Sequence, residues 1–233
     1  MAQLVSDCPR CNSSKTTFDV GAQNHILVKY EWQNWFEVFA ICRQCSKSTV
    51  FLISQANITG SEEWKSRGIQ SLTTSLNRYF NIERHISLSD SHSIVPPEHL
   101  PAEIESAFTE GARCHSIGCY NAAATMFRLC VDHASRARLP SEDTQGLNSN
   151  TRRSLGLRLK WLFEAGRLPS ELRELSVCIK EDGNDGAHAG ILKKEDADDI
   201  LDFTFELLKR LFTEPKRLEL ATLRRDERRR PKT

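Results

Sequence analysis

The chain has 233 residues, of which 39% are hydrophobic and 27% are charged. This composition is typical of a globular protein, and the length allows one medium domain and one small domain. The formal net charge of +1 excludes a global field that would draw the chain to nucleic acid or to a membrane. No apolar run approaches the roughly 20 residues of a membrane-spanning helix. The N-terminus lacks the features of a signal peptide, and we expect a cytoplasmic protein.

Two Cys-x-x-Cys pairs near the N-terminus predict a metal site. The pairs are Cys8 with Cys11 and Cys42 with Cys45. Four thiolates close a tetrahedral site, so we expect a structural Zn²⁺ whose removal unfolds the small domain around it. The alternative is a redox-active pair or a set of uncoordinated thiols.

The remaining cysteines favour a reducing compartment. They lie in helical sequence among small and apolar residues, where a free thiol packs like a small hydrophobic side chain. They are Cys114, Cys119, Cys130 and Cys178.

The residues around the cysteine pairs predict β-strands. Segments 25–30, 35–41 and 48–53 are rich in β-branched and aromatic residues. We assign residues 1–58 to a zinc-ribbon domain. Its aromatic side chains are either a stacking platform for nucleic-acid bases or the core of a small domain, and the second interpretation is the simpler one. They are Tyr30, Trp32, Trp35 and Phe36.

A linker is expected over residues 59–100. The periodicity there is weak, with a short helix or strand expected within 69–80. Prolines at positions 96, 97 and 101 mark the end of this linker, because proline disfavours continuation of a helix.

From residue 101 to residue 213 the apolar residues recur with the period of an α-helix. Helices are predicted from 102, over 119–137, over 152–165 with Gly166 as its C-cap, from 169 to 183, and over 194–212. Short connections between helices indicate a bundle. The fold class is therefore α+β, with a small β domain followed by an all-α domain.

One combination of residues resembles a known family. Arg128 lies in an alanine-rich helix, Gly183-Asn184-Asp185-Gly186-Ala187-His188 follows, and an acidic helix then ends at Pro215. Over about residues 101–215 this is similar to the domain-of-unknown-function 4145 family, a branch of the HEPN-like helical superfamily. Several members also carry an N-terminal zinc ribbon. The resemblance implies a HEPN-like bundle, a homodimer and a role in prokaryotic antiphage defence or restriction, with RNA, DNA or a protein as partner.

The resemblance also implies a candidate catalytic site. HEPN domains include metal-independent RNA endonucleases, and here His188 is the candidate acid or base, supported by Lys180, Asn184 and Arg128. The strict Arg-x(4–6)-His motif is absent, because residues 181–183 are Glu, Asp and Gly. Lys180 keeps the charge but lacks the bidentate fork of arginine.

A non-catalytic interpretation of the same residues stays open. The segment 183–188 can end a helix, with Arg128 paired to Asp182 or Asp185 in a buried network that His115 and His133 could join. The function expected is a module that binds nucleic acid or a partner protein. A metal-independent endoribonuclease and a structural dimeric adaptor are the alternatives.

The C-terminal residues 214–233 form a basic tail. From Thr213 to Thr233 there are eight Lys or Arg against four Asp or Glu. The tail either contacts phosphates, which would make binding depend on salt, or is a solvated helix end.

Overall fold

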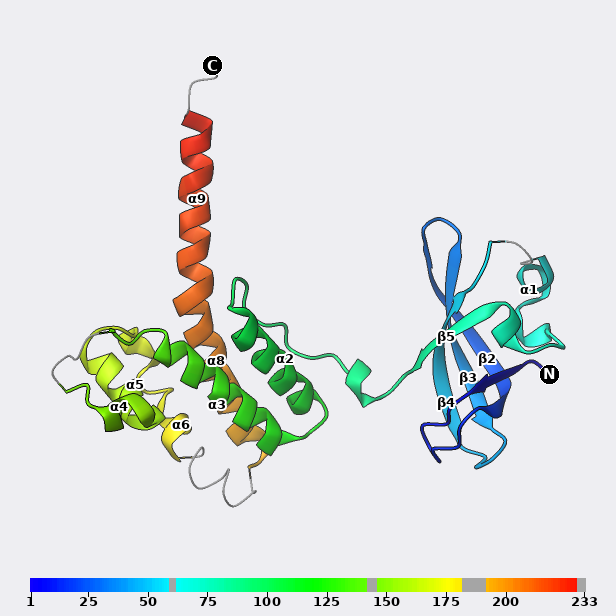
Figure 1. Ribbon diagram of the computed structural model, residues 1–233, viewed down its shortest axis with the longest axis horizontal. Helices are drawn as coiled ribbons and strands as arrows, with labels where there is room; N and C mark the ends of the chain where they lie inside the picture. Colours follow the sequence, from blue (N-terminus) through cyan, green and yellow to red (C-terminus); the bar gives the residue numbers. More distant parts are fainter. Residues whose placement is uncertain (59–61, 142–145, 182–191, 230–233) are drawn as a thin grey trace. The chain divides into compact units, whose positions relative to one another are not determined.

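The computed structural model describes residues 1–58, 62–141, 146–181 and 192–229 (Figure 1). It divides into two compact units, Met1–Asp90 and Ser91–Thr233, each with its own buried core. The fold is α+β, because an antiparallel sheet precedes a set of helices. Within the described ranges, none of the helices has both the length and the apolar character that crossing a bilayer requires.

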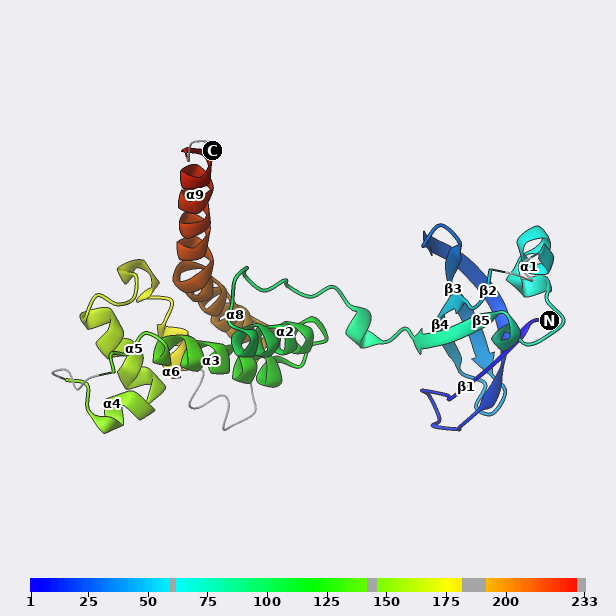
Figure 2. The same cartoon turned by 45° about the horizontal axis from the view of Figure 1, so that its top comes forward.

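The N-terminal unit is built on a five-stranded antiparallel sheet with strand order β1-β2-β3-β4-β5 (Figure 2). The strands are β1 (Gln3–Ser6), β2 (Thr16–Lys29), β3 (Gln33–Cys42), β4 (Ser48–Gln55) and β5 (Phe80–His85). Irregular pairing after Val20 and after His25 interrupts the long β2 ladder, and such bulges bend and twist a strand. The three predicted strands are confirmed, although β2 begins earlier than expected. β1 and β5 were not predicted.

The core of this unit includes residues that the sequence analysis assigns to a linker. Trp64, Ile69, Leu72 and Leu76 are buried, and the Trp64 ring lies 5.2 Å from the ring of Phe80. They follow one another through α1 (Glu62–Arg67), η1 (Ile69–Ser71) and η2 (Leu76–Arg78). Such short turns carry too few residues to show a helical period. This part of the predicted linker therefore belongs to the first unit, which η3 (Leu88–Asp90) completes.

The aromatic residues around the β2–β3 turn divide between the two interpretations. Phe36 is buried and packs edge-on against Trp64 and Phe80, as a core residue does. Tyr30 is 78% exposed. Trp35 carries the ammonium group of Lys29 over its ring at 3.9 Å.

Helices make up the second unit. They are α2 (Ala102–Ser116), α3 (Tyr120–Arg136), α4 (Ser149–Arg153), α5 (Leu155–Glu164), η4 (Ser170–Leu172), α6 (Val177–Glu181), α8 (Lys194–Leu208), η6 (Lys209–Thr213) and α9 (Glu214–Arg229). The first, second and fifth predicted helices are confirmed. The third is broken at Ser154, which has extended backbone angles. The prediction of one helix after Pro169 is wrong, because η4 and turns precede the short α6.

Two glycines have structural roles that depend on the missing side chain, and the first of them was predicted as a C-cap. Gly166, with φ of +65°, ends α5, since the Arg167 N–H donates to the Leu162 carbonyl at 2.9 Å. Gly111 lets α2 approach α3, because a Cβ there would lie 2.8 Å from the Phe127 ring.

A buried arginine organises the interior of the helical unit. The Arg158 side chain is fully buried and forms an ion pair with Asp132. Its Nε donates to Ser135 Oγ at 3.0 Å, and its Nη1 donates to the Arg152 carbonyl at 2.6 Å. Arg158 therefore satisfies a carbonyl at the end of α4 that the break at Ser154 leaves without its helical partner. Sequence analysis did not identify this network.

A proline explains the wide turn between α8 and α9. Pro215 has no N–H for the carbonyl four residues before it, and its ring crowds that carbonyl. The carbonyl belongs to Leu211, and it accepts a hydrogen bond from the Arg138 guanidinium instead. The chain adopts a π-helical turn over Lys209–Thr213, so the helix continues past Pro215 as α9.

Replacing Arg158 should test the importance of the buried network. We expect Arg158→Met to lower the free energy of unfolding of the helical unit by about 3 kcal/mol, because Asp132 and Ser135 lose a buried partner. Arg136 is the matched control, since it also bonds Asp132, at 2.6 Å, but is half exposed. Arg136→Met should cost less than about 1 kcal/mol. Urea unfolding followed by circular dichroism at 222 nm measures both, and equal losses would contradict the assignment.

Candidate metal centre

Four cysteines converge at one end of the strands, where β1 joins β2 and β3 joins β4. The sulfur atoms of Cys8, Cys11, Cys42 and Cys45 all lie within 4.8 Å of one another, and the Cys8 and Cys45 sulfurs are 3.9 Å apart. Cys8 and Cys42 are buried, whereas Cys11 is exposed. None of the eight cysteines, all of them described, forms a disulfide. The predicted ligand set is therefore brought together.

The two cysteine-bearing turns have the same backbone geometry. In the first turn, the Cys8 N–H donates to the Ser13 carbonyl and the Asn12 N–H donates to the Cys8 carbonyl, both at 2.9 Å. The turn that begins at Cys42 repeats both bonds, at 3.0 and 2.8 Å. The residue after each second cysteine, Asn12 or Ser46, has a φ of +57°. Each turn thus presents two thiols from one tight bend, as a tetrahedral metal site requires.

The sheet holds the two turns together. The first turn lies between β1 and β2, and the second joins β3 to β4. Cys42 is the last residue of β3 and lies opposite Phe18 of β2. The Arg43 N–H donates to the Thr17 carbonyl at 3.0 Å, and the Arg43 guanidinium pairs with Asp19 at 2.6 Å. The site is therefore positioned by ladder pairing as well as by its own loops.

Electrostatics at the cluster favour a bound cation. Hydrogen bonds from the side chain and backbone of Ser13 lower the pKa of Cys11 to about 6. The Lys47 N–H favours the Cys45 thiolate, but burial and the neighbouring thiols outweigh it and raise the pKa of Cys45 to about 11. One thiolate therefore disfavours the next, and a divalent cation relieves that repulsion. Sequence patterns did not identify Ser13. The only signal in the sequence was a hydroxyl residue two positions after Cys11.

The donor set fits zinc. Four cysteine sulfurs, with no fifth donor among the described residues of the cluster, are typical of a closed structural site, and soft thiolates select zinc over hard cations. A zinc ion bound here would cross-link the β1–β2 and β3–β4 loops and would supply folding free energy.

The predicted catalytic residues are only partly described. Arg128, half-buried on α3, donates from Nη1 to the Ile179 carbonyl at 2.7 Å. Lys180 is in the same short helix, α6, as Ile179, but its side chain lies outside the described part of the chain. Asn184 and His188, and the proposed partners Asp182 and Asp185, also lie outside the described residues. The structure therefore brings Arg128 to α6, and the grouping of all four residues stays a prediction.

The two other histidines considered as members of this network have separate partners. His115 lies 2.6 Å from an Asp198 oxygen, which connects α2 to α8. His133 lies 3.7 Å from Glu103. Hydrogen bonds from Lys194 and, to a smaller extent, from His115 lower the pKa of Asp198 below its usual value, and together they outweigh burial, which raises it. These contacts tie helices together at the surface.

Comparison with known proteins identifies the helical part of the chain. A family model described as Domain of unknown function (DUF4145) matches residues 109–226, which is about half of the chain. The matched range runs from within α2 into α9 and leaves the four-cysteine unit outside it. No curated protein and no solved structure matches the chain.

Metal content tests the centre directly. We expect purified, unchelated protein to contain one zinc ion per chain and Cys42→Ser to lose it, because three thiolates leave the site open. The control is Cys119→Ser, an exposed cysteine outside the cluster, which should keep the metal. Elemental analysis gives the stoichiometry. Thermal unfolding followed by tryptophan fluorescence reports mainly on the first unit, because Trp32, Trp35 and Trp64 lie there and only Trp161 lies in the second unit. Metal-free wild-type protein would refute the assignment.

Proposed function

The chain belongs to the DUF4145 family, and we propose for it a non-catalytic role, the binding of single-stranded nucleic acid. In this proposal the N-terminal unit is a zinc ribbon and the second unit is a HEPN-like bundle. The cationic end of α9 provides the contacts with phosphates. The exposed arginines of α9 are the observation that carries the proposal.

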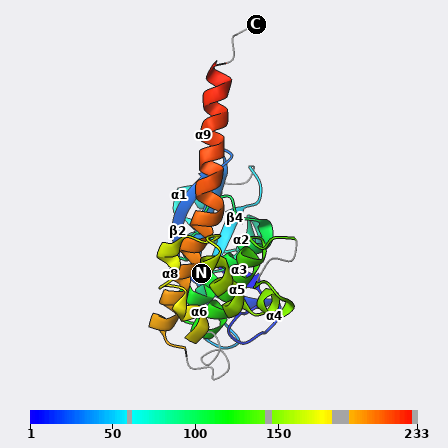
Figure 3. The same cartoon turned by 90° about the vertical axis from the view of Figure 1, so that its left-hand side faces the viewer.

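The α9 helix contributes no side chain to the core. None of its residues is buried, and Figures 1 and 3 show it extending away from the other helices of its unit. A helix normally draws its stability from packing an apolar face. Here α9 instead continues α8 through the π-helical turn, so it is already nucleated. The side chains of α9 that form no ion pair among the described residues are therefore available for contacts outside the unit.

The cations of α9 fall into two groups. Lys216 and Arg217 are engaged, with Glu219 at 2.9 Å and Glu98 at 3.1 Å. The other group occupies the last six described residues of the helix, and none of its members belongs to an ion pair of the described residues. It consists of Arg224, Arg225, Arg228 and Arg229. Exposed guanidinium groups on a helix are common ligands of nucleic-acid phosphates.

The contact made by Arg128 supports a non-catalytic role. Its guanidinium donates to a backbone carbonyl of α6, so at least part of its hydrogen-bonding capacity holds two helices together. The strict Arg-x(4–6)-His motif is also absent from the sequence. A guanidinium committed to the backbone has fewer donors left for a transferring phosphoryl group.

Salt dependence of binding tests the proposal. Fluorescence anisotropy with labelled 20-nucleotide RNA and DNA strands should show affinity that falls linearly with salt on logarithmic axes. Removing two charges with Arg224→Gln and Arg225→Gln should reduce that slope by about 1.4, because each phosphate contact with a single strand contributes about 0.7.

The matched control is the double variant Lys216→Gln and Arg217→Gln. It removes the same charge from the same helix, but both of its cations are already paired with carboxylates. Its slope should stay close to that of the wild type. A wild-type affinity that does not change with salt would count against phosphate contacts altogether.

The nuclease alternative has its own test. Wild-type protein incubated with labelled single-stranded RNA and EDTA should leave the RNA intact on a denaturing gel. Cleavage that resists EDTA and disappears in His188→Ala would overturn the non-catalytic role and support the endoribonuclease mechanism. His115→Ala serves as the control, since that histidine is paired with Asp198.

A further inference from the structure

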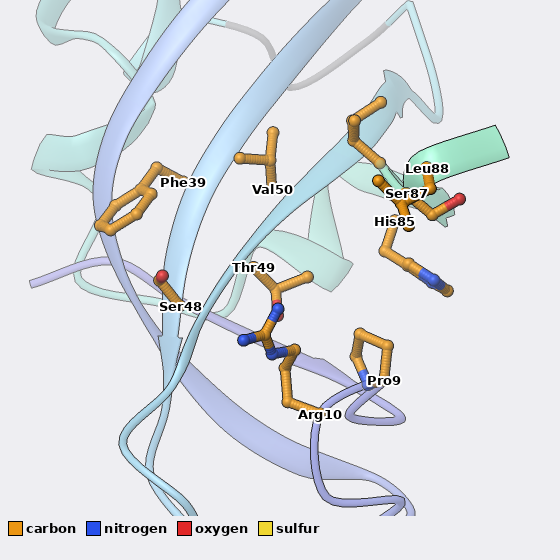
Figure 4. A pocket seen from close by; sticks show the side chains of 10 residues that line it. Pro9, Arg10, Phe39, Ser48, Thr49, Val50, His85, Ser87 and Leu88 are labelled. Atoms are coloured by element: carbon orange, nitrogen blue, oxygen red, sulfur yellow. The ribbon is translucent and has the colours of Figure 1, made fainter. Parts of the chain in front are cut away.

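A pocket with a volume of about 370 Å³ lies beside the first cysteine turn, at the point where β5 leaves β4. His85, the last residue of β5, pairs with Phe51, and the Ile86 N–H makes a final bond to the Val50 carbonyl at 2.7 Å. Beyond it, Ser48 and Thr49 of β4 line the pocket together with Pro9 and Arg10 of the turn (Figure 4). Pockets of this size are usual for small ligands.

Thr49 is the first feature that points to a ligand in the pocket. The residue is 8% exposed, and its hydroxyl oxygen is buried without a hydrogen-bond partner among the described residues. Buried hydroxyls in native proteins nearly always have a partner, so such an exception calls for an explanation. Because Thr49 is part of the pocket lining, a ligand with a hydrogen-bonding group would supply the missing partner.

The charge of the lining indicates an anion. Figure 4 shows the Arg10 side chain directed from the cysteine turn toward Thr49, with the His85 ring at the far side. Ser48 and Ser87 add two hydroxyls. Of the described residues that line the pocket, none is acidic. Arginine together with hydroxyl donors is a typical arrangement for binding phosphate oxygens.

An apolar wall distinguishes the pocket from a simple anion site. Phe39 of β3 lies opposite Val50 of β4 and is 39% exposed. Leu88, which lines the pocket beside His85, is 70% exposed. Phe39 and Val50 share the outer face of the sheet, whereas Thr49 lies opposite the buried Ala40 on the inner face. A ligand that contacts both sides must pass around the edge of β4 beyond its last bond to Ile86. There the exposed Phe39 ring offers a surface on which a base can stack.

We infer that this pocket binds a nucleotide, with the phosphate at Arg10 and Thr49 on the inner face of the sheet and the base reaching around the edge of β4 to Phe39. The ligand is either a free nucleotide or the terminal residue of a single strand, since both carry the same chemistry. The inference goes beyond strand binding by α9, because the pocket lies in the other unit and a free nucleotide would satisfy it.

Calorimetric titration of the zinc-loaded full chain with adenosine monophosphate tests the inference. Arg10→Gln should weaken binding by at least about tenfold, through loss of a charged hydrogen bond. Thr49→Val should weaken binding about fivefold and yet raise the melting temperature, because it removes a buried hydroxyl without a partner. Phe39→Ala should weaken binding of the nucleotide but not of inorganic phosphate.

Arg43→Gln is the matched control. Arg43 occupies the second cysteine turn and borders the same thiolates, but it is paired with Asp19 and does not line the pocket. It should leave nucleotide binding unchanged. Metal content is measured in every variant, because Arg10 could act only by compensating the charge of the thiolates. In that case Arg10→Gln would lose metal and would have no specific effect on nucleotide binding. That result would overturn the inference.

Two further probes identify the source of the ligand. Oligonucleotides of five residues, with and without a 5′-phosphate, compete with adenosine monophosphate if the pocket holds a strand end, and do not compete if it takes only the free nucleotide. No binding of any of these probes, or equal binding by the Arg10, Thr49 and Arg43 variants, would overturn the inference. Such failure leaves the α9 titration unaffected, because that experiment changes different residues and measures a salt slope.

Discussion

The convergence of four thiols is the constraint on which the N-terminal unit depends. Their sulfurs lie within 4.8 Å, a spacing at which several thiolates repel one another unless a cation lies between them. The two turns that carry them come from different parts of the sheet, so a bound metal would close the β1–β2 loop onto the β3–β4 hairpin. The same constraint fixes Arg10, which lies between Cys8 and Cys11 and points into the neighbouring pocket.

The two units achieve stability in different ways. The sheet unit has a small core in which aromatic residues such as Phe18, Phe51 and Phe80 pack among aliphatic ones, and a unit of this size benefits from a metal cross-link. The helical unit has a larger core of aliphatic and aromatic side chains with an ion pair inside it. That pair, Arg158 with Asp132, is bonded to Ser135 and to the end of α4, and it specifies where α4 stops and α5 begins.

Sequence patterns predicted the features that short-range chemistry dictates. The cysteine spacing indicated the ligand set, and the apolar period gave α2, α3 and α8, because each of these helices is long enough to repeat its buried face. The patterns did not predict η1 and η2, whose buried residues Ile69 and Leu76 each lie in a single turn. Nor did they predict the roles of Arg158 and Thr49, because burial of a polar side chain depends on which distant segments cover it.

The proline at position 215 has a consequence that extends beyond its own turn. The buried face of α8 includes Leu201 and Leu208 and continues to Leu211 of η6, and an unbroken α-helix would carry that face onward at its regular period. A π-helical turn adds one residue and so rotates everything after it by about 100° relative to the helix before it. The direction in which the terminal guanidinium groups face is therefore set by the phase shift that one imino acid imposes, although that residue need not touch any partner of α9.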